Sequence, residues 1–159
     1  MTPIAPCLWF NNQAEEAARY YTELFPDSRI DRIVRAPVNN PGAEKGAVSV
    51  VEFTLNGQPY LALNGGMDNP FTEAVSFTIA TETQEETDQI WDRIIAEGGA
   101  AIQCGWCRDR FGLRWQIYPR RMLDLLSHED RELAARAMQA MMTMVKIEIA
   151  DVEKAASGG

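Results

Sequence analysis

The chain carries a CxxC pair, a cysteine spacing found in redox dithiols and in zinc sites. Residues 104–107 read Cys-Gly-Trp-Cys, and the third cysteine, Cys7, lies near the start of the chain. A redox pair needs a helix N-terminus to activate its first thiol, and a four-cysteine zinc site needs a second pair. Residues 104–107 lead into a predicted hairpin and no second pair exists, so we expect Cys104 and Cys107 to be structural and Cys7 to be a buried strand residue.

A second group of polar side chains falls on one face of a predicted strand. Residues 113–118 alternate between apolar and polar, which places Arg114, Gln116 and Tyr118 together on one face. We expect this face to line a cavity, in which Arg114 would bind a carboxylate or a phosphate. Further arginines either extend this positive surface or pair with surface acids: Arg108, Arg110, Arg120 and Arg121.

Three more residues are candidates for the same cavity, a hydroxyl, an indole and an amide: Ser76, Trp106 and Asn64. Aromatic rings at strand ends wall ligand pockets about as often as they fill cores, so both roles stay open for Trp106, Trp9 and Phe71. The one histidine, His128, is interpreted as a solvated residue at a helix start. No paired carboxylates and no nucleophile–base pair are apparent.

The elements that must position these residues occur twice along the chain. In the first half we predict strands at 4–10, 29–36, 48–55 and 60–63, and a helix that Asn12 caps with Glu15 in the capping-box position. Residues 37–46 hold two Pro, two Asn and two Gly and are predicted to form a loop. Asn56-Gly57 predicts a tight hairpin between the last two strands.

The second half repeats this order, with strands predicted at 75–80, 101–104, 106–108 and 113–118 and a helix capped by Thr83 and Glu86. After Pro119 we predict a helical turn at 122–126, a Met-rich helix capped by Ser127, an extended piece at 146–149 and a last turn at 151–156. The predicted fold is therefore α+β: two βαβββ modules, 1–70 and 71–120, form a curved mixed sheet around one cavity, and 121–159 is a helical extension.

Composition limits the classes of function. The chain has 159 residues, 46% hydrophobic and 24% charged, as in ordinary globular proteins. A net charge of −8 argues against a nucleic-acid partner, and no apolar run is long enough to span a bilayer. Residues 1–6 have no signal-peptide pattern and cysteines are few, so we expect a cytoplasmic protein without a membrane partner. The Met-rich helix would suit a homodimer.

Several segments, in the same order, resemble one known group of proteins. They are residues 6–10 (Pro-Cys-Leu-Trp-Phe), 57–66 (Gly-Gln-Pro-Tyr-Leu-Ala-Leu-Asn-Gly-Gly), 103–106 (Gln-Cys-Gly-Trp), 109–116 (Asp-Arg-Phe-Gly-Leu-Arg-Trp-Gln) and 144–149 (Met-Val-Lys-Ile-Glu-Ile). With the duplicated arrangement, they resemble the PhnB-like branch of the vicinal oxygen chelate superfamily, which includes glyoxalase, bleomycin-resistance and extradiol dioxygenase proteins. This branch often carries the label 3-demethylubiquinone-9 3-methyltransferase.

The resemblance also implies where a metal would be bound. Metal-using relatives supply two ligands from each half, usually His or Glu. The matching positions here are near Pro6, at Tyr60 or Leu61, near Val75 or Ser76, and at Gln116. None of these is His, Asp or Glu, and neutral oxygens are poor replacements. We therefore expect no divalent metal of the usual kind and no cofactor.

The function expected from these observations is the binding of a small organic molecule, of which an anion is one option, without a metal. Its contacts would be Arg114, Gln116, Tyr118, Ser76, Trp106 and Asn64. A metal-independent lyase, isomerase or transferase and a purely structural dimer remain the alternatives. Methyl transfer is disfavoured because Gly65-Gly66 follows a hairpin strand and precedes Pro70, whereas a nucleotide-cofactor site needs a glycine-rich turn that enters a helix.

Overall fold

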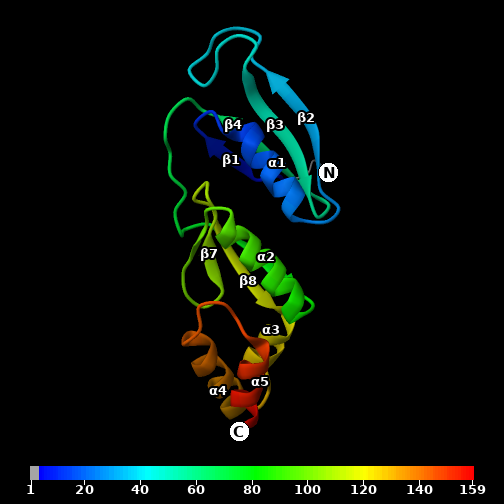
Figure 1. Cartoon of the computed structure of the whole chain (residues 1–159), viewed down its shortest axis with the longest axis vertical. Coiled ribbons are helices and arrows are strands. Elements are labelled where there is room, and N and C mark those ends of the chain that lie inside the picture. The colour runs from blue at the N-terminus through cyan, green and yellow to red at the C-terminus, as the bar shows by residue number, and fades with distance from the viewer. Residues whose placement is uncertain (1–3) are drawn as a thin grey trace. The chain divides into compact units, whose positions relative to one another are not determined.

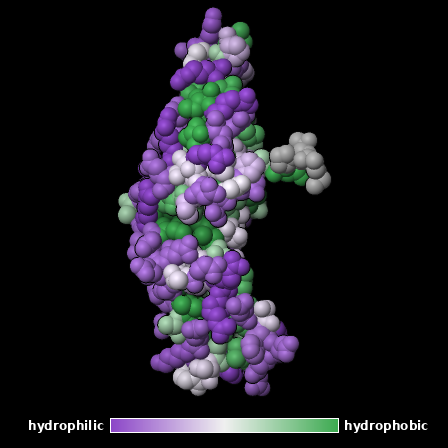
Figure 2. Space-filling view, turned by 90° about the vertical axis from the view of Figure 1, so that its right-hand side faces the viewer, coloured by the Kyte–Doolittle hydropathy of each residue, from purple (hydrophilic) through white to green (hydrophobic). Residues whose placement is uncertain are grey.

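The computed structural model describes residues 4–159 and divides the chain into two compact units, the first ending at Pro70 and the second spanning Phe71–Gly159. Residues 1–3, which belong to the segment used above to exclude a signal peptide, lie outside the described part. Hydrophilic residues cover most of the surface in view in Figure 2, as the charged fraction predicts. No helix among residues 4–159 is both long and apolar enough to cross a membrane.

The two units contain sheets of the same topology (Figure 1). The first unit holds β1 (Cys7–Phe10), α1 (Ala14–Leu24), β2 (Arg29–Arg35), β3 (Val48–Leu55) and β4 (Gln58–Asn64). The second begins with β5 (Phe77–Thr81), α2 (Gln84–Ala96), β6 (Ala100–Ala101), β7 (Trp106–Arg108) and β8 (Arg114–Pro119). The strand orders are β1-β4-β3-β2 and β5-β8-β7-β6, with a parallel first pair and antiparallel pairs thereafter. The predicted duplication and the α+β class are confirmed, with one four-stranded mixed sheet in each unit.

Helix α1 packs on the first sheet through small residues and aromatic rings. Ala14, Ala17 and Ala18 are fully buried, so the helix backbone can approach the strands closely. The Tyr21 ring stacks on Phe53 of β3 with 6.3 Å between ring centroids. The hairpin between β3 and β4 turns at Asn56 and Gly57, whose φ angles of 45° and 78° are those of the tight turn that Asn-Gly favours.

The predicted cap of α1 by Asn12 is wrong. Asn12 has a left-handed backbone with φ of 64°, and Gln13 precedes the helix without a capping side-chain hydrogen bond. The backbone N–H of Ala14 instead donates to Oδ1 of Asn64, at 2.9 Å, from the end of β4. Asn64, which is distant in the sequence, therefore accepts the hydrogen bond that the local sequence pattern predicted for Asn12.

The predicted cap of α2 is confirmed. The N–H of Glu86 donates to Oγ1 of Thr83 at 3.1 Å, and the carboxylate of Glu86 accepts from the backbone N–H of Glu82 at 2.8 Å. Both partners of this capping box are close in sequence, so the local pattern was enough to predict the helix start.

The C-terminal extension contains α3 (Arg120–Leu126), α4 (Arg131–Met142) and α5 (Ile149–Ser157). The cap predicted at Ser127 is wrong: Ser127 ends α3, and Asp130 caps α4 by accepting from the N–H groups of Glu132 and Leu133. The extended piece predicted at 146–149 is also wrong, because residues 144–148 are irregular and α5 begins at Ile149. The strand predicted at 101–104 is reduced to β6, because Cys104 turns away with φ of 56°.

These helices share a compact unit with the second sheet. Their apolar core is made by Met122, Leu125, Ala137, Ile147, Val152 and Ala156. Gln84 at the start of α2 reaches this region, since its side chain donates to the carbonyl of Ile147 and accepts from the N–H of Ile149, each at 2.9 Å. The N–H of Gly105 also donates to the carbonyl of Val145 at 2.8 Å.

Candidate functional site

Five of the six predicted site residues lie on or beside one face of the second sheet. Along β8, Trp115, Ile117 and Pro119 are buried, whereas Arg114, Gln116 and Tyr118 are half-buried on the opposite face. Neighbouring strands extend that face, because Thr78 and Trp106 are the register partners of Gln116. We call this surface the polar sheet face; it comprises Ser76, Thr78, Trp106, Arg108, Arg114, Gln116 and Tyr118.

The centre of the polar sheet face is a hydrogen-bonded pair. Nε2 of Gln116 donates to Oγ of Ser76 at 2.8 Å, so a side chain just before β5 and one in the middle of β8 are fixed together. The half-buried indole of Trp106 stands beside Gln116 on β7. This arrangement offers a ligand hydrogen-bonding groups next to a flat aromatic surface.

Arg114 is a desolvated cation with few acceptors. Its side chain is 16% exposed and pairs with Glu73 at 3.5 Å, while Glu73 itself is 68% exposed. One terminal nitrogen donates to the carbonyl of Gly112. The Nε–H is buried and has no acceptor within residues 4–159. A guanidinium has five N–H donors, so Arg114 retains capacity for an oxygen-rich anion.

Most of the other predicted arginines have structural partners. Arg120 pairs with Glu82 and Arg121 with Glu153, each at 3.0 Å and exposed to water. The guanidinium of Arg110 lies over the ring of Phe111, 4.9 Å from its centroid. Arg108 is the register partner of Arg114 and adds positive charge to the polar sheet face.

Tyr118 and Asn64 differ from the other candidates in their surroundings. The Tyr118 ring packs against the apolar core of the C-terminal helices. Asn64 belongs to the first unit and is 5% exposed. Its amide accepts from the N–H of Ala14 and donates to the carbonyl of Val48, both at 2.9 Å. Contact of either residue with a ligand remains a prediction.

Glu52, in the first unit, is a candidate site residue that the sequence did not predict. Glu52 lies on the face of β3 opposite to Val51 and Phe53, and its cross-strand neighbours are Leu61 and Arg32. Nε of Arg32 donates to Glu52 at 2.9 Å, and a second, shorter hydrogen bond completes a two-point pair that raises the pKa of Arg32. A carboxylate within the mostly apolar run 48–55 is the signal that could have identified it.

Two of the positions that correspond to metal ligands in relatives, Tyr60 and Leu61, are poor metal ligands here. The ring of Tyr60 stacks on Phe53 at 5.5 Å, and burial raises the pKa of its hydroxyl, so Tyr60 would have to lose a tightly held proton to bind a cation. Leu61 has no donor atom in its side chain. Among the described residues, no three or more His, Cys, Asp or Glu side chains gather in a group that could hold a metal ion.

The cysteines are in three different environments, and none of them forms a disulfide. Cys107 lies in β7 and is fully buried, and burial together with the nearby charge of Asp109 raises its pKa to about 12. Cys7 is exposed, so the prediction that it is buried is wrong. It lies on the face of β1 opposite to the buried residues Leu8 and Phe10.

We predict that Cys107 does not react with iodoacetamide in the folded protein at pH 8, whereas Cys7 does. With a pKa near 12, only about one Cys107 thiol in ten thousand is ionised at that pH, and the sulfur is also shielded from reagent. Peptide mass spectrometry after timed alkylation measures both sites. Complete labelling in 6 M guanidinium is the control, and alkylation of native Cys107 at the rate of Cys7 would contradict the prediction.

Other predicted features lie apart from the polar sheet face. Nδ1 of His128 accepts from the N–H of Asp130 at 3.1 Å, and the residue is exposed near the start of α4, as predicted. Met138 and Met142 on α4 are 40% and 55% exposed, while Met141 packs on the C-terminal core. The homodimer suggested by the Met-rich helix stays a prediction.

Comparison with known proteins identifies relatives of the whole duplicated region. The sequence model of the 3-demethylubiquinone-9 3-methyltransferase family matches residues 2–118. A PhnB protein from Bacillus cereus is 35% identical, with 72% of this chain and 97% of that chain covered and a TM-score of 0.64. Protein PA1353 from Pseudomonas aeruginosa is 18% identical over 72% and 95% of the two chains, with a TM-score of 0.59.

A more distant likeness concerns the fold alone. The fosfomycin resistance protein FosX from Listeria monocytogenes is 14% identical, over 72% of this chain and 89% of that chain, with a TM-score of 0.50. No curated protein matches the sequence. The resemblance predicted from residues 6–10, 57–66, 103–106 and 109–116 is confirmed, and residues 144–149 lie outside the matched region.

Proposed function

We propose that this chain, which belongs to the 3-demethylubiquinone-9 3-methyltransferase family, binds a small organic molecule as a PhnB-like protein. The ligand would be an anion, held on the polar sheet face. The observation that carries this proposal is Arg114, whose side chain is mostly buried and whose one ion pair within residues 4–159, with Glu73, is long. A carboxylate, phosphate or phosphonate would replace Glu73 and accept from the terminal N–H groups of Arg114.

The surroundings of Arg114 favour an organic anion over an inorganic one. The Ser76–Gln116 pair offers further hydrogen bonds, and the indole of Trp106 offers apolar contact on the same face. Glu73 is a weak competitor, because an exposed carboxylate at 3.5 Å gains little from the pairing. The ligand therefore needs only modest affinity to displace it.

Binding without a divalent metal is part of the proposal. Leu61 offers no donor at one of the inherited positions, and Ser76 and Gln116 are bonded to each other at two more. The family name refers to methyl transfer, but the strand-to-helix connections at 11–13 and 82–83 contain no glycine that would admit a nucleotide phosphate. Binding is thus better supported than methyl transfer.

The test is a thermal-shift screen of small carboxylates, phosphates and phosphonates against three proteins: wild type, Arg114→Ala and Arg120→Ala. Arg120 is the matched control, since it is an exposed arginine in a surface ion pair away from the polar sheet face. We expect an anion that stabilises wild type to bind Arg114→Ala about 10- to 100-fold more weakly, as for the loss of a charge-assisted contact, and to bind Arg120→Ala normally.

Two outcomes would contradict the proposal. Equal stabilisation of wild type and Arg114→Ala would remove Arg114 from the site. Loss of the ligand-induced shift after treatment with EDTA, restored by a divalent cation, would show that a metal takes part in binding.

A further inference from the structure

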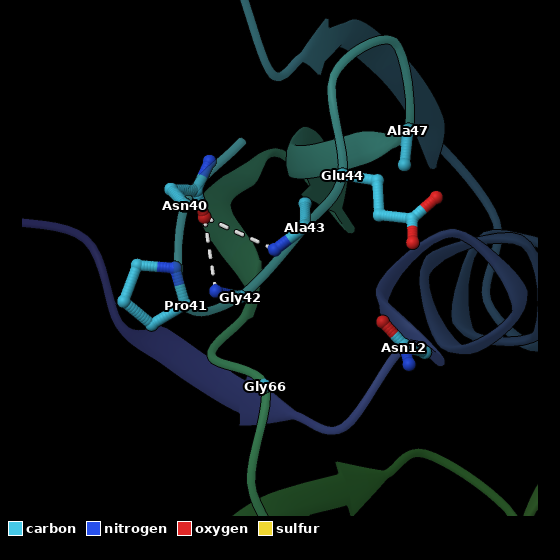
Figure 3. A pocket seen from close by; sticks show the side chains of 8 residues that line it. All are labelled: Asn12, Asn40, Pro41, Gly42, Ala43, Glu44, Ala47 and Gly66. Atoms are coloured by element: carbon cyan, nitrogen blue, oxygen red, sulfur yellow. Dashed lines mark hydrogen bonds between the residues drawn. The ribbon is translucent and has the colours of Figure 1, made fainter. Parts of the chain in front are cut away.

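A pocket of about 410 Å³ lies in the first unit, and nothing described so far uses it. Its lining comes from three segments: Asn12 before α1, the loop between β2 and β3, and Gly66 after β4 (Figure 3). It shares no residue with the polar sheet face. Its volume is in the range of pockets that hold small organic molecules.

The base of the pocket is preformed by close backbone packing. Oδ1 of Asn40 accepts from the N–H groups of Gly42 and Ala43, at 2.9 and 3.0 Å, which fixes the loop. Gly66 has φ of 77°, and a Cβ atom there would lie 1.8 Å from the carbonyl oxygen of Pro41. A Cβ on Gly42 would lie 2.1 Å from a backbone oxygen of Asn64. The loop therefore rests on the chain after β4 in one arrangement.

Two polar side chains face each other across this base. Figure 3 shows the carboxylate of Glu44 and the carboxamide of Asn12 turned toward one another over the hollow. Neither side chain has a hydrogen bond or an ion pair within residues 4–159. Among the lining residues Glu44 is the one with a charged side chain, and Lys45, the next residue of the loop, does not belong to the lining.

The N-terminus of α1 lies near the pocket but does not make the pocket favourable to anions. A helix N-terminus favours anions through its free N–H groups. Here the N–H of Ala14 is already bonded to Asn64, and the first helical turn carries Glu15 and Glu16. Within the lining, an anionic ligand would meet the carboxylate of Glu44.

We propose that this pocket binds a small organic cation through a primary ammonium group, held between the carboxylate of Glu44 and the carbonyl oxygen of Asn12. An ammonium has three N–H donors and no acceptor, which matches two oxygen acceptors and the carbonyl groups of the loop. A bare divalent cation fits less well, because two side chains fall far short of the six to eight oxygen ligands that calcium takes. The apolar part of the ligand would contact Pro41 and Ala47.

The test is an NMR titration of ¹⁵N-labelled protein with n-butylamine at pH 7, with 1-butanol as the neutral molecule of the same shape. We expect butylamine to shift the amide signals of residues 40–47 and 66 with saturation, and butanol to leave them in place. Glu44→Gln removes the charge without touching a structural hydrogen bond and should weaken binding about tenfold or more, as should Asn12→Gly, which accepts the left-handed backbone.

Glu85→Gln is the matched control, since Glu85 is an exposed glutamate on α2 and makes the same change in net charge. Binding should be unchanged in this variant. The proposal is overturned if butanol produces the same shifts, if Glu44→Gln binds as wild type does, or if butylamine shifts signals evenly over the acidic surface.

Discussion

Replacement of Asp109 by alanine is expected to destabilise the second unit by about 3–5 kcal/mol, because three N–H groups lose their acceptor. Asp109 is 1% exposed. Oδ1 accepts from the N–H groups of Phe111 and Leu113, at 2.9 and 3.1 Å, and Oδ2 accepts from Nε1 of Trp115 at 2.9 Å. Leu113 and Trp115 are themselves buried, so water cannot replace the lost oxygen atoms.

Urea unfolding followed by tryptophan fluorescence measures this loss, since Trp91, Trp106 and Trp115 all belong to the second unit. Asp109→Asn should retain part of the stability, because one amide oxygen can still accept from the turn. The exposed residue Asp124 provides the control, and Asp124→Ala should change the free energy of unfolding by less than about 0.5 kcal/mol. If Asp109→Ala unfolds at the wild-type urea concentration, Asp109 is not the anchor of the turn.

Asn64→Ala is expected to destabilise the first unit by about 2–4 kcal/mol, because it leaves a buried N–H and a partly buried carbonyl without their partner. The amide of Asn64 joins the first N–H of α1 to the carbonyl of Val48, which begins β3. It thereby connects three elements: the helix, β3 and β4.

Hydrogen exchange of the Ala14 amide is the most direct measurement, because that N–H should become exposed to water in Asn64→Ala. Asn64→Asp keeps the acceptor for Ala14 but places a carboxylate against the Val48 carbonyl, so it too should be destabilised. Asn69→Ala, an exposed asparagine beyond β4, is the control. Unchanged exchange of Ala14 in Asn64→Ala would show that Asn64 does not hold the helix start.

The sequence predicted those parts of the fold whose determinants are close together in the chain. The Asn56-Gly57 hairpin, the Thr83–Glu86 cap and the alternation along residues 113–118 each depend on two to six consecutive positions. Asn12 failed as a cap because Asn64, from the end of β4, takes the same N–H and leaves Asn12 in a left-handed turn. Ser127 failed because Asp130, three residues later, also fits a cap and is used instead.

The candidate site also combines features that the local sequence predicts with features that depend on distant contacts. Alternation placed Arg114 and Gln116 on one face without any knowledge of the fold. The bond between Gln116 and Ser76 depends on parallel pairing of two strands, which no local pattern contains. The pocket beside Glu44 depends on the contact of Gly42 and Gly66 with distant backbone, so composition predicts only that residues 37–46 form a loop.

The pairing of the first strand with the last one has a consequence for synthesis on the ribosome. Cys7 pairs in register with Leu61, so β1 has no neighbouring strand in the sheet until β4 has left the exit tunnel. In the second unit β5 waits in the same way for β8, because Phe77 pairs with Trp115. The sheet of each unit therefore cannot be completed before its final strand emerges, and the sheet of the first unit can be complete while the second unit is still being made.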